Sequence, residues 1–368
     1  MAQSPVTYSP SVETFGKDEL EIDRQLVDLL RGISEVTYRN SGHALRSVHA
    51  KAHGLLKGEL EVLDGLPANL SQGLFATAGR YPVIMRFSTI PGDILDDAVS
   101  TLRGLAIKVL GVRGDRLPGS EDDVTQDFLF VNAPAFGAAS TAKFLGALKL
   151  VAKTTDRGEP LKKALSAVLR RVESVVESFG GKSATLIALG GHPETHILGE
   201  TFYSQAPIRY GDFIAKIAVA PVSPELRALS NAPVGTSGKP NFLRDAVRDF
   251  FKTQSGVWEL RVQLCVDLEK MPVEDSSKPW PEDLSPYVAV ARITAGAQDS
   301  WSASNIKSVD DGAAFSPWRG LAAHQPLGAI MRARKEAYRM SADFRTQRNG
   351  CPIREPGVAE QTNGPSSR

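Results

Sequence analysis

The fold of this 368-residue chain is decided by the stretch Leu45-Arg46-Ser47-Val48-His49-Ala50-Lys51, around which the other segments can be arranged. A single histidine is more often structural than catalytic, so His49 alone predicts little. Three distant segments change that interpretation, because each carries polar side chains within a strand or helix pattern. They are Arg86-Phe87-Ser88-Thr89, Asn132 before Ala133-Pro134, and Arg334 with Tyr338 and Arg345.

Composition excludes several classes of function. Hydrophobic residues make up 42% and charged residues 23% of the chain, which is ordinary for a soluble globular protein. The formal net charge of +1 gives no reason to expect nucleic acid or an anionic membrane as a partner. No apolar run approaches the ~20 residues that span a bilayer, so stable membrane insertion is not expected.

Residues at the N-terminus and the cysteines bear on the compartment. Met1-Ala2-Gln3-Ser4-Pro5 has no basic start and no apolar stretch behind it, which argues against a secretory signal. Cys265 and Cys351 form no C-x-x-C pair and no disulfide framework. The sequence therefore predicts an intracellular protein in a reducing cytoplasm.

Hydrophobic periodicity predicts a mixed α+β chain. Alternating or continuous apolar runs favour strands at 58–63, 83–88, 105–110, 128–131, 213–219, 258–266 and 287–293. Helical patterns occupy 17–38, 69–81, 138–152, 160–179, 242–252 and 328–347. A mostly antiparallel β-barrel with surrounding helices fits this order best. We expect one domain over 17–349, between a flexible N-terminal arm at 1–16 and a flexible tail at 350–368.

The helix at 328–347 has a spacing that can be interpreted chemically. Residues four and seven apart return to one helix face, so Arg334, Tyr338 and Arg345 share a stripe. A neighbouring cation favours the phenolate form of a tyrosine, and phenolate is an axial ligand of haem iron in catalases. The alternative is a half-buried helix tyrosine flanked by solvated arginines.

The segments near His49 could supply the opposite side of such a site. Cleavage of a peroxide O–O bond needs a base that moves a proton from one oxygen to the other, and neutral histidine suits that role near pH 7. An amide can hold the peroxide, and a hydroxyl behind the imidazole can fix its tautomer. Arg86 and Ser88 lie on one face of a strand, so one could meet an anionic group while the other contacts His49.

Four stretches resemble the haem-dependent catalase family. They are RSVHAKAHG (46–54), MRFSTIPGD (85–93), RGLAIKVLG (103–111) and DFLFVNAPAF (127–136). With the helix at 328–347, the resemblance covers roughly residues 40 to 350. It implies a catalase-like barrel that forms a single haem-binding domain, and it implies haem b as the cofactor.

The resemblance also implies a role for each matching residue. His49 would be the distal acid/base, Asn132 its amide partner and Ser88 the hydroxyl that hydrogen-bonds His49. Tyr338 would bind the iron, with Arg334 holding it as phenolate. Further haem contacts would come from Val48, which walls the pocket, Phe144, which covers the distal face, and Arg46, Arg86 and Arg345, which bind the propionates.

Departures from the family pattern refine the predicted activity. HQPLGAIMRARKEAY (324–338) is similar to the smaller catalase-related peroxidases and to the coral allene oxide synthase branch. The valine at position 48 is the catalase residue, whereas the synthase branch has threonine there. We therefore expect a haem-dependent peroxidase, an oxidoreductase that reduces hydrogen peroxide or organic hydroperoxides with the help of a small organic or lipid substrate.

Other functions stay open at this stage. They are a true catalase, a fatty-acid hydroperoxide lyase or allene oxide synthase-like enzyme, and a non-catalytic haem carrier. The oligomeric state is also open, with a homo-oligomer as one option. A thiolate haem site at Cys351 lacks the surrounding Phe and Gly pattern. His192 and His196 have a zinc-like spacing, but Pro193 makes the segment a turn, so ordinary loop histidines are favoured.

Overall fold

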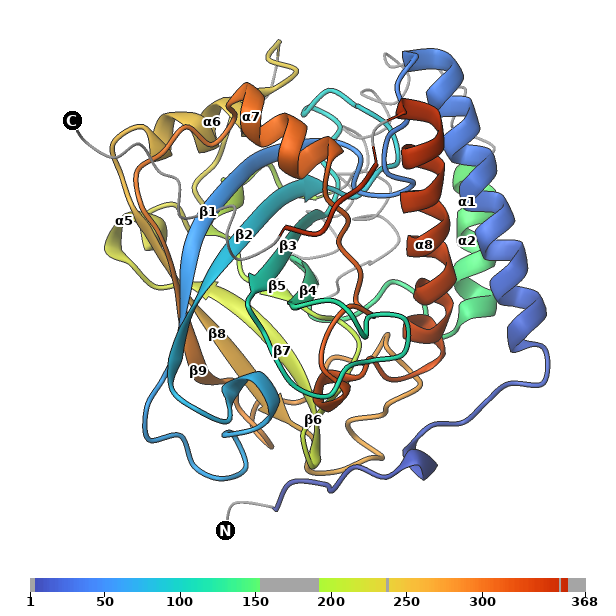
Figure 1. Ribbon diagram of the computed structural model, residues 1–368, viewed down its shortest axis with the longest axis vertical. Helices are drawn as coiled ribbons and strands as arrows, with labels where there is room; N and C mark the ends of the chain where they lie inside the picture. Colours follow the sequence, from blue (N-terminus) through green and yellow to red (C-terminus); the bar gives the residue numbers. More distant parts are fainter. Residues whose placement is uncertain (1–3, 153–191, 236–237, 351, 357–368) are drawn as a thin grey trace, which may run out of the picture.

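The computed structural model describes residues 4–152, 192–235, 238–350 and 352–356 (Figure 1). Within these residues the strands form one antiparallel sheet in the order β5-β4-β3-β2-β1-β9-β8-β7-β6. Their bounds are β1 Ala52–Val62, β2 Gly79–Thr89, β3 Arg103–Leu110, β4 Thr125–Val131, β5 Phe202–Tyr203, β6 Ile208–Tyr210, β7 Phe213–Pro221, β8 Gly256–Leu264 and β9 Val288–Ala295.

A short pairing closes the sheet into a barrel. Phe202 and Tyr203 of β5 lie opposite Val219 and Ala218 of β7, so eight of the described strands form a ring and β6 extends from it. Closure pairs the strand edges that an open sheet would expose to other chains. The predicted α+β class with an antiparallel barrel is confirmed.

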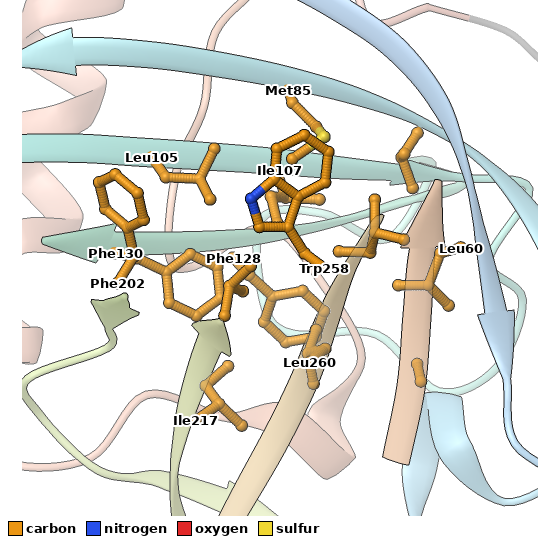
Figure 2. Packing of buried hydrophobic residues seen from close by; sticks show 14 of the residues in the cluster. Leu60, Met85, Leu105, Ile107, Phe128, Phe130, Phe202, Ile217, Trp258 and Leu260 are labelled. Carbon is orange, nitrogen blue, oxygen red and sulfur yellow. The ribbon is translucent and has the colours of Figure 1, made fainter. Parts of the chain in front are cut away.

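Large apolar side chains fill the barrel, as the alternation of each strand requires. Trp258 is fully buried, and its ring centroid lies 6.2 Å from that of Phe87. Figure 2 shows Trp258 between Met85 and Leu260, with Phe128 close by. Because Met85 and Phe87 face this core, Arg86 and Ser88 on the same strand face the opposite side.

Helices cover that opposite side. The helices of four or more described residues are α1 Glu19–Ser41, α2 Thr141–Ala152, α5 Pro224–Arg227, α6 Phe242–Phe251 and α8 Ala329–Asn349. Helices α1, α2 and α8 lie side by side at one flank of the barrel (Figure 1). Leu30 of α1 packs with Met340 and Phe344 of α8, while Leu26, Leu145 and Ala333 join all three helices. No helix in the described ranges has the length and apolarity needed to cross a membrane.

Along the chain, a segment of short helical turns connects β9 to α8. It contains α7 Ala303–Asn305, the π-helix η4 Ile306–Asp311 and the 3₁₀ turn η5 Ala322–His324. The other 3₁₀ turns are η1 Pro10–Val12, η2 Gly73–Phe75 and η3 Ile197–Gly199. Single π-helical turns are rare and often occur at functional sites, so η4 is a segment of interest.

Most predicted elements are found close to their expected bounds, with one clear error. The helix predicted at 69–81 is wrong: the segment contains only η2, and strand β2 already begins at Gly79. Gly73 has φ +54°, and a side chain there would collide with the ring of His324. This left-handed residue ends any helix before a second turn forms. The helix predicted at 160–179 lies outside the described residues.

The described parts of the two terminal segments make specific contacts. The amide of Val6 donates to the carbonyl of Cys265 at 2.8 Å, and that of Tyr8 donates to Asp212 at 2.8 Å. At the other end, the Arg354 amide donates to Gly312 at 3.0 Å, and Glu355 pairs with Lys108 at 2.6 Å. Residues 4–8 and 354–355 therefore lie against the barrel domain.

Candidate active site

His49 occupies a constrained position in the loop between α1 and β1. Its φ is +56°, a left-handed value that is uncommon for a residue with a side chain. Its amide donates to the carbonyl of Ile90 at 2.7 Å. A Cβ at Gly104 would collide with the imidazole, so the absence of a side chain on β3 makes room for the ring. The surrounding structure therefore holds His49 in a backbone conformation that costs of order 1–3 kcal/mol.

The imidazole of His49 has one fixed polar partner. Its Nδ1 lies 3.1 Å from the Oγ of Ser88, which β2 presents on its outer face. This contact leaves Nε2 as the ring nitrogen available to a bound molecule. Burial lowers the pKa of His49 to about 3, and the charges of Arg86, Arg334 and Arg46 act in the same direction. The ring is thus neutral near pH 7.

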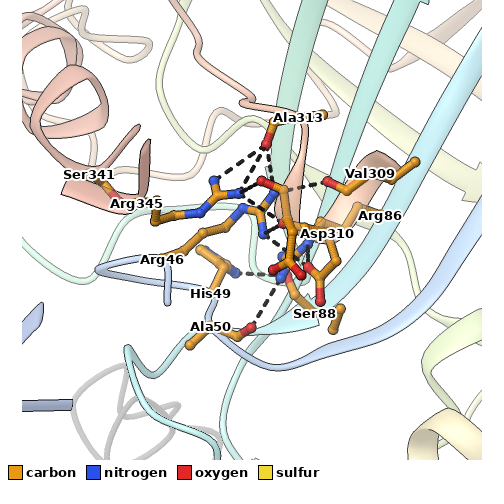
Figure 3. A network of polar contacts seen from close by, with 12 residues as sticks. Arg46, His49, Ala50, Arg86, Ser88, Val309, Asp310, Ala313, Ser341 and Arg345 are labelled. Carbon is orange, nitrogen blue, oxygen red and sulfur yellow. Dashed lines mark hydrogen bonds and ion pairs between the residues drawn. The ribbon is translucent and has the colours of Figure 1, made fainter. Parts of the chain in front are cut away.

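Three arginines meet beside His49, and Asp310 of η4 lies between two of them (Figure 3). The Oδ1 of Asp310 accepts from Arg46 Nη1 and from Arg86 Nε, both at 2.9 Å. Arg345 donates to the main-chain carbonyl of Asp310 at 2.9 Å. The chain just after the π-helix supplies a further carbonyl, because Arg46 also donates to Ala313 at 3.0 Å. These contacts join β2, η4, α8 and the His49 loop.

The charges of this arginine cluster do not balance. Three guanidinium groups carry three positive charges, and Asp310 supplies one negative charge. Burial lowers the pKa of Arg46, and the charges of Arg345 and Arg86 lower it further. Burial raises the pKa of Asp310, but Arg86 and Arg46 outweigh it, so the pKa lies below its usual value. The charge of Asp311 also raises the pKa of Arg46 and of Arg345, so it offsets part of the remainder. The cluster keeps a surplus of positive charge, which suits an anionic ligand.

Helix α8 brings the predicted proximal residues to the same place. The Nη2 of Arg334 donates to the Oη of Tyr338 at 2.9 Å, one helical turn away. Arg345 follows seven residues after Tyr338 and reaches the arginine cluster. A guanidinium that donates to a phenol oxygen stabilises negative charge on that oxygen. The arrangement therefore places a cationic donor against the Tyr338 oxygen.

These groups line one pocket between strands β2–β4 and helix α8. Its empty volume, with open solvent at the mouth included, is about 750 Å³. Of the predicted site residues, the lining includes Arg46, Val48, His49, Arg86, Ser88, Arg334, Tyr338 and Arg345. Apolar side chains complete it, among them Leu105, Leu129, Phe130 and Phe315.

Asn132 is not among the residues that line this pocket. It follows β4, and its neighbour Val131 does line the pocket. The Asn132 amide nitrogen donates to His192 Nε2 at 2.7 Å and to the carboxylate of Glu200. Its carbonyl oxygen accepts from the amide of Arg103 at 2.8 Å. The amide predicted to hold a peroxide is thus engaged by other partners.

Phe144 also lies away from the pocket lining. It belongs to α2, where its ring meets Phe136 edge to face at 5.0 Å and packs beside Leu26 and Ala333. It therefore stabilises the contact between α1, α2 and α8. The aromatic residues that line the pocket are Phe130 and Phe315, together with Tyr338.

Several lining or supporting residues were missed from the sequence. Asp310 lies in an irregular stretch with no periodic signal, and only its acidic type could have drawn attention to it. Gly104 belongs to the stretch RGLAIKVLG, where a glycine that opens a buried strand suggests close approach of another group. Ser341 continues the stripe of Arg334 and Tyr338, and its Oγ accepts from the amide of Ser47 at 3.1 Å.

The residues present fit a haem group. Tyr338 and His49 are the phenol and the imidazole in the lining, and they come from different elements, α8 and the loop before β1. The surplus of positive charge in the arginine cluster suits the anionic propionates. No group of three or more His, Cys, Asp or Glu that could hold a metal ion occurs in the described ranges.

Comparisons with known proteins identify the architecture. No family model matches the sequence, and no curated protein matches it. Among solved structures, catalase A from Saccharomyces cerevisiae is similar with a TM-score of 0.56 and 17% identity, over 100% of this chain and 75% of that chain. A fungal catalase gives a TM-score of 0.57 and 17% identity, over 99% and 72%.

A bacterial catalase shows the same likeness, with a TM-score of 0.53 and 14% identity, over 96% of this chain and 66% of that chain. At these identities the likeness concerns the fold. The chain therefore has the α+β barrel architecture of the catalases.

Proposed function

We propose that this protein is a haem-dependent peroxidase that reduces hydrogen peroxide or organic hydroperoxides. The observation that carries the proposal is the shared pocket of His49, held neutral by burial, and Tyr338, whose oxygen accepts from Arg334. A histidine base and a phenol able to bind iron, present in one pocket, are the two groups that peroxide cleavage on haem needs. The catalase-like fold supports the same assignment.

Each side chain has a role in this proposal. Tyr338 would bind the iron of haem b, and Arg334 would stabilise the negative charge on its oxygen. Arg46, Arg86 and Arg345 would hold the propionates, while Val48 would wall the pocket beside His49. When bound, haem would supply the iron that polarises the O–O bond and the electrons that break it.

Proton movement is the task of His49 and Ser88. The Nε2 of His49 would take the proton from the near oxygen of the peroxide and return it to the far oxygen. Ser88 would keep the ring in place through Nδ1 at 3.1 Å. The overall reaction converts ROOH, two electrons and two protons into ROH and water, with the electrons supplied by an organic reductant.

Asn132 bears on the choice between peroxidase and catalase. Catalase chemistry must also bind and oxidise a second hydrogen peroxide, which a distal amide helps to hold. The Asn132 amide hydrogen-bonds His192 and Glu200 and is not in the lining. A pocket whose distal polar groups are His49 and Ser88 therefore favours oxidation of an external reductant. Asn132 would be able to hold a second hydrogen peroxide only if its contacts with His192 and Glu200 opened.

One comparison tests the proposal against its alternatives. Purified, haem-loaded protein is given hydrogen peroxide or a fatty-acid hydroperoxide, and oxygen release and dye oxidation are followed separately. Dye oxidation that exceeds oxygen release is the expected result. Rapid oxygen release without dye oxidation would assign a catalase, and loss of the lipid hydroperoxide without any reductant would assign a lyase or allene oxide synthase. Bound haem with no turnover would assign a carrier.

A cytoplasmic location and assembly with copies of the same chain remain predictions. Fractionation of cells and the mass of the purified protein in solution test these two points directly.

A further inference from the structure

A line of contacts leads from the pocket to Trp318. The guanidinium of Arg334 donates to the Oη of Tyr338 at 2.9 Å and, through Nη1, to the Sδ of Met331 at 3.1 Å. The main-chain carbonyl of Met331 accepts from the indole Nε1–H of Trp318 at 2.6 Å. Short, connected contacts of this kind couple an indole outside the lining to a phenol within it.

Trp318 lies in the loop that follows the pocket wall. Ala314 and Phe315 line the pocket, whereas Trp318, three residues after Phe315, does not. Its side chain is half-buried, so part of the indole reaches solvent while its ring nitrogen is fixed to the first turn of α8. The ring is therefore both held in place and open to a molecule that cannot enter the pocket.

A positive charge accompanies the indole. The Nζ of Lys335 lies 5.0 Å from the ring centroid of Trp318, within the range of a cation–π contact. A cation at the ring disfavours positive charge on it, which makes an oxidised indole a stronger acceptor of electrons. The same cation attracts an anionic reductant.

We propose that Trp318 is a second oxidation site, at which electron-rich anionic aromatic compounds too large for the pocket are oxidised. This inference rests on the proposed peroxidase function and names a class of reductant for it. A small phenol reaches the pocket itself, whereas a bulky anion delivers its electron to Trp318, and the contacts through Met331 and Arg334 carry it inward.

The electrons and protons balance over two turns of this site. In each turn Trp318 gives one electron to the site oxidised by the peroxide, and one molecule of reductant gives one electron back to Trp318. Two such turns supply the two electrons that convert ROOH, with two protons from solvent, into ROH and water. The reductant leaves as two one-electron-oxidised molecules.

The test compares two reductants in three proteins. The bulky dianion ABTS and the small phenol guaiacol are oxidised with hydrogen peroxide by wild type, Trp318→Phe and Trp301→Phe. Trp301 is the matched control, because it is also half-buried and stacks on a cation, Arg244 at 3.9 Å, whereas the indole that donates to Met331 is that of Trp318. We expect Trp318→Phe to lose ABTS oxidation by about tenfold or more and to keep guaiacol oxidation, and Trp301→Phe to keep both.

A spectroscopic measurement tests the inference independently of the turnover rates. Haem-loaded wild type grown with indole-deuterated tryptophan is frozen after mixing with peroxide, and its electron paramagnetic resonance spectrum should show a tryptophan radical. The signal should be absent from Trp318→Phe and present in Trp301→Phe. Equal ABTS rates in all three proteins, or a radical that does not respond to deuterated tryptophan, would overturn the inference while leaving the peroxidase intact. If wild type oxidises neither reductant, the proposed function itself fails.

Discussion

The Nδ1 of His49 lies 3.1 Å from the Oγ of Ser88, and this contact joins a loop residue with left-handed backbone to the outer face of strand β2 (Figure 3). The two residues are 39 positions apart in the sequence. Their contact fixes the ring and leaves Nε2 for a peroxide. The His49–Ser88 pair is therefore the part of the proposed site whose removal should affect the proton transfer most directly.

Replacing His49 by alanine should lower peroxide-driven dye oxidation by ~10²–10⁴-fold, the usual contribution of a positioned proton-transfer group. Ser88→Ala should have a smaller effect, about tenfold, because the base remains but its ring is less well oriented. Stopped-flow mixing with hydrogen peroxide measures both. His43→Gln is the control, since His43 is half-exposed and pairs with Asp311. An equal loss in the control, or full activity in His49→Ala, would contradict the assignment.

The low pKa of His49 also predicts how stability depends on pH. The pKa is about 3 in the folded protein and about 6.5 in the unfolded chain, so the unfolded state binds the proton more readily. Between these values, stability should fall as the pH falls, by up to about 1.4 kcal/mol per pH unit from this residue. Above about pH 6.5 the ring is neutral in both states and contributes no slope.

Urea unfolding of wild type and His49→Gln from pH 7 to pH 4 checks this prediction. The variant should lose stability toward acid less steeply, because it lacks the titration of His49. Part of the loss should remain, because other buried histidines such as His324, with a pKa of about 4, still contribute. Parallel curves for the two proteins would mean that His49 titrates normally in the folded state.

Much of the fold could be predicted because its signals are local. The alternation in β8 and β9 and the helical periods of α1 and α8 lie within single elements, and the structure places those elements near their predicted bounds. The barrel closure could not be predicted in this way. It depends on β5, a strand of two residues, which is too short to show a period.

The same difference between local and long-range signals applies to the residues of the site. Arg334 and Tyr338 meet because helix geometry brings residues four apart together, so spacing alone was sufficient. The orientation of Asn132 depends on His192 and Glu200, which lie 60 and 68 positions away. Asp310 reaches Arg46 across 264 positions. Contacts over such distances leave no pattern in one sequence.

Neutralising Asp310 should destabilise the protein. Asp310→Asn keeps an oxygen that can accept from Arg46 and Arg86 but removes the negative charge that pairs with these two guanidinium groups. Breaking such a buried ion pair costs about 3 kcal/mol. Asp311→Asn is a close control, because that carboxylate pairs with half-exposed His43, and its loss should cost less than about 1 kcal/mol. Unfolding in urea at pH 7 measures both, and equal losses would show that Asp310 has no special role.

The last prediction concerns the ligand of the iron and its arginine. Tyr338→Phe removes the oxygen that accepts from Arg334 at 2.9 Å, so the variant should lose haem or lose the absorption bands of a phenolate-bound ferric haem. Arg334→Leu keeps the phenol but removes the guanidinium that stabilises its anion, so haem retention should become dependent on pH and fall toward acid. Arg334→Lys should restore part of the retention, because it keeps the charge without the planar donor pair.

Tyr38→Phe is the control, since Tyr38 packs against Phe344 at 6.2 Å and does not line the pocket. Absorption spectra and the haem content of each purified variant between pH 5 and pH 9 give the answer. Full haem content with an unchanged spectrum in Tyr338→Phe would remove Tyr338 as the ligand, and pH-independent retention in Arg334→Leu would show that its contact with the phenol is incidental.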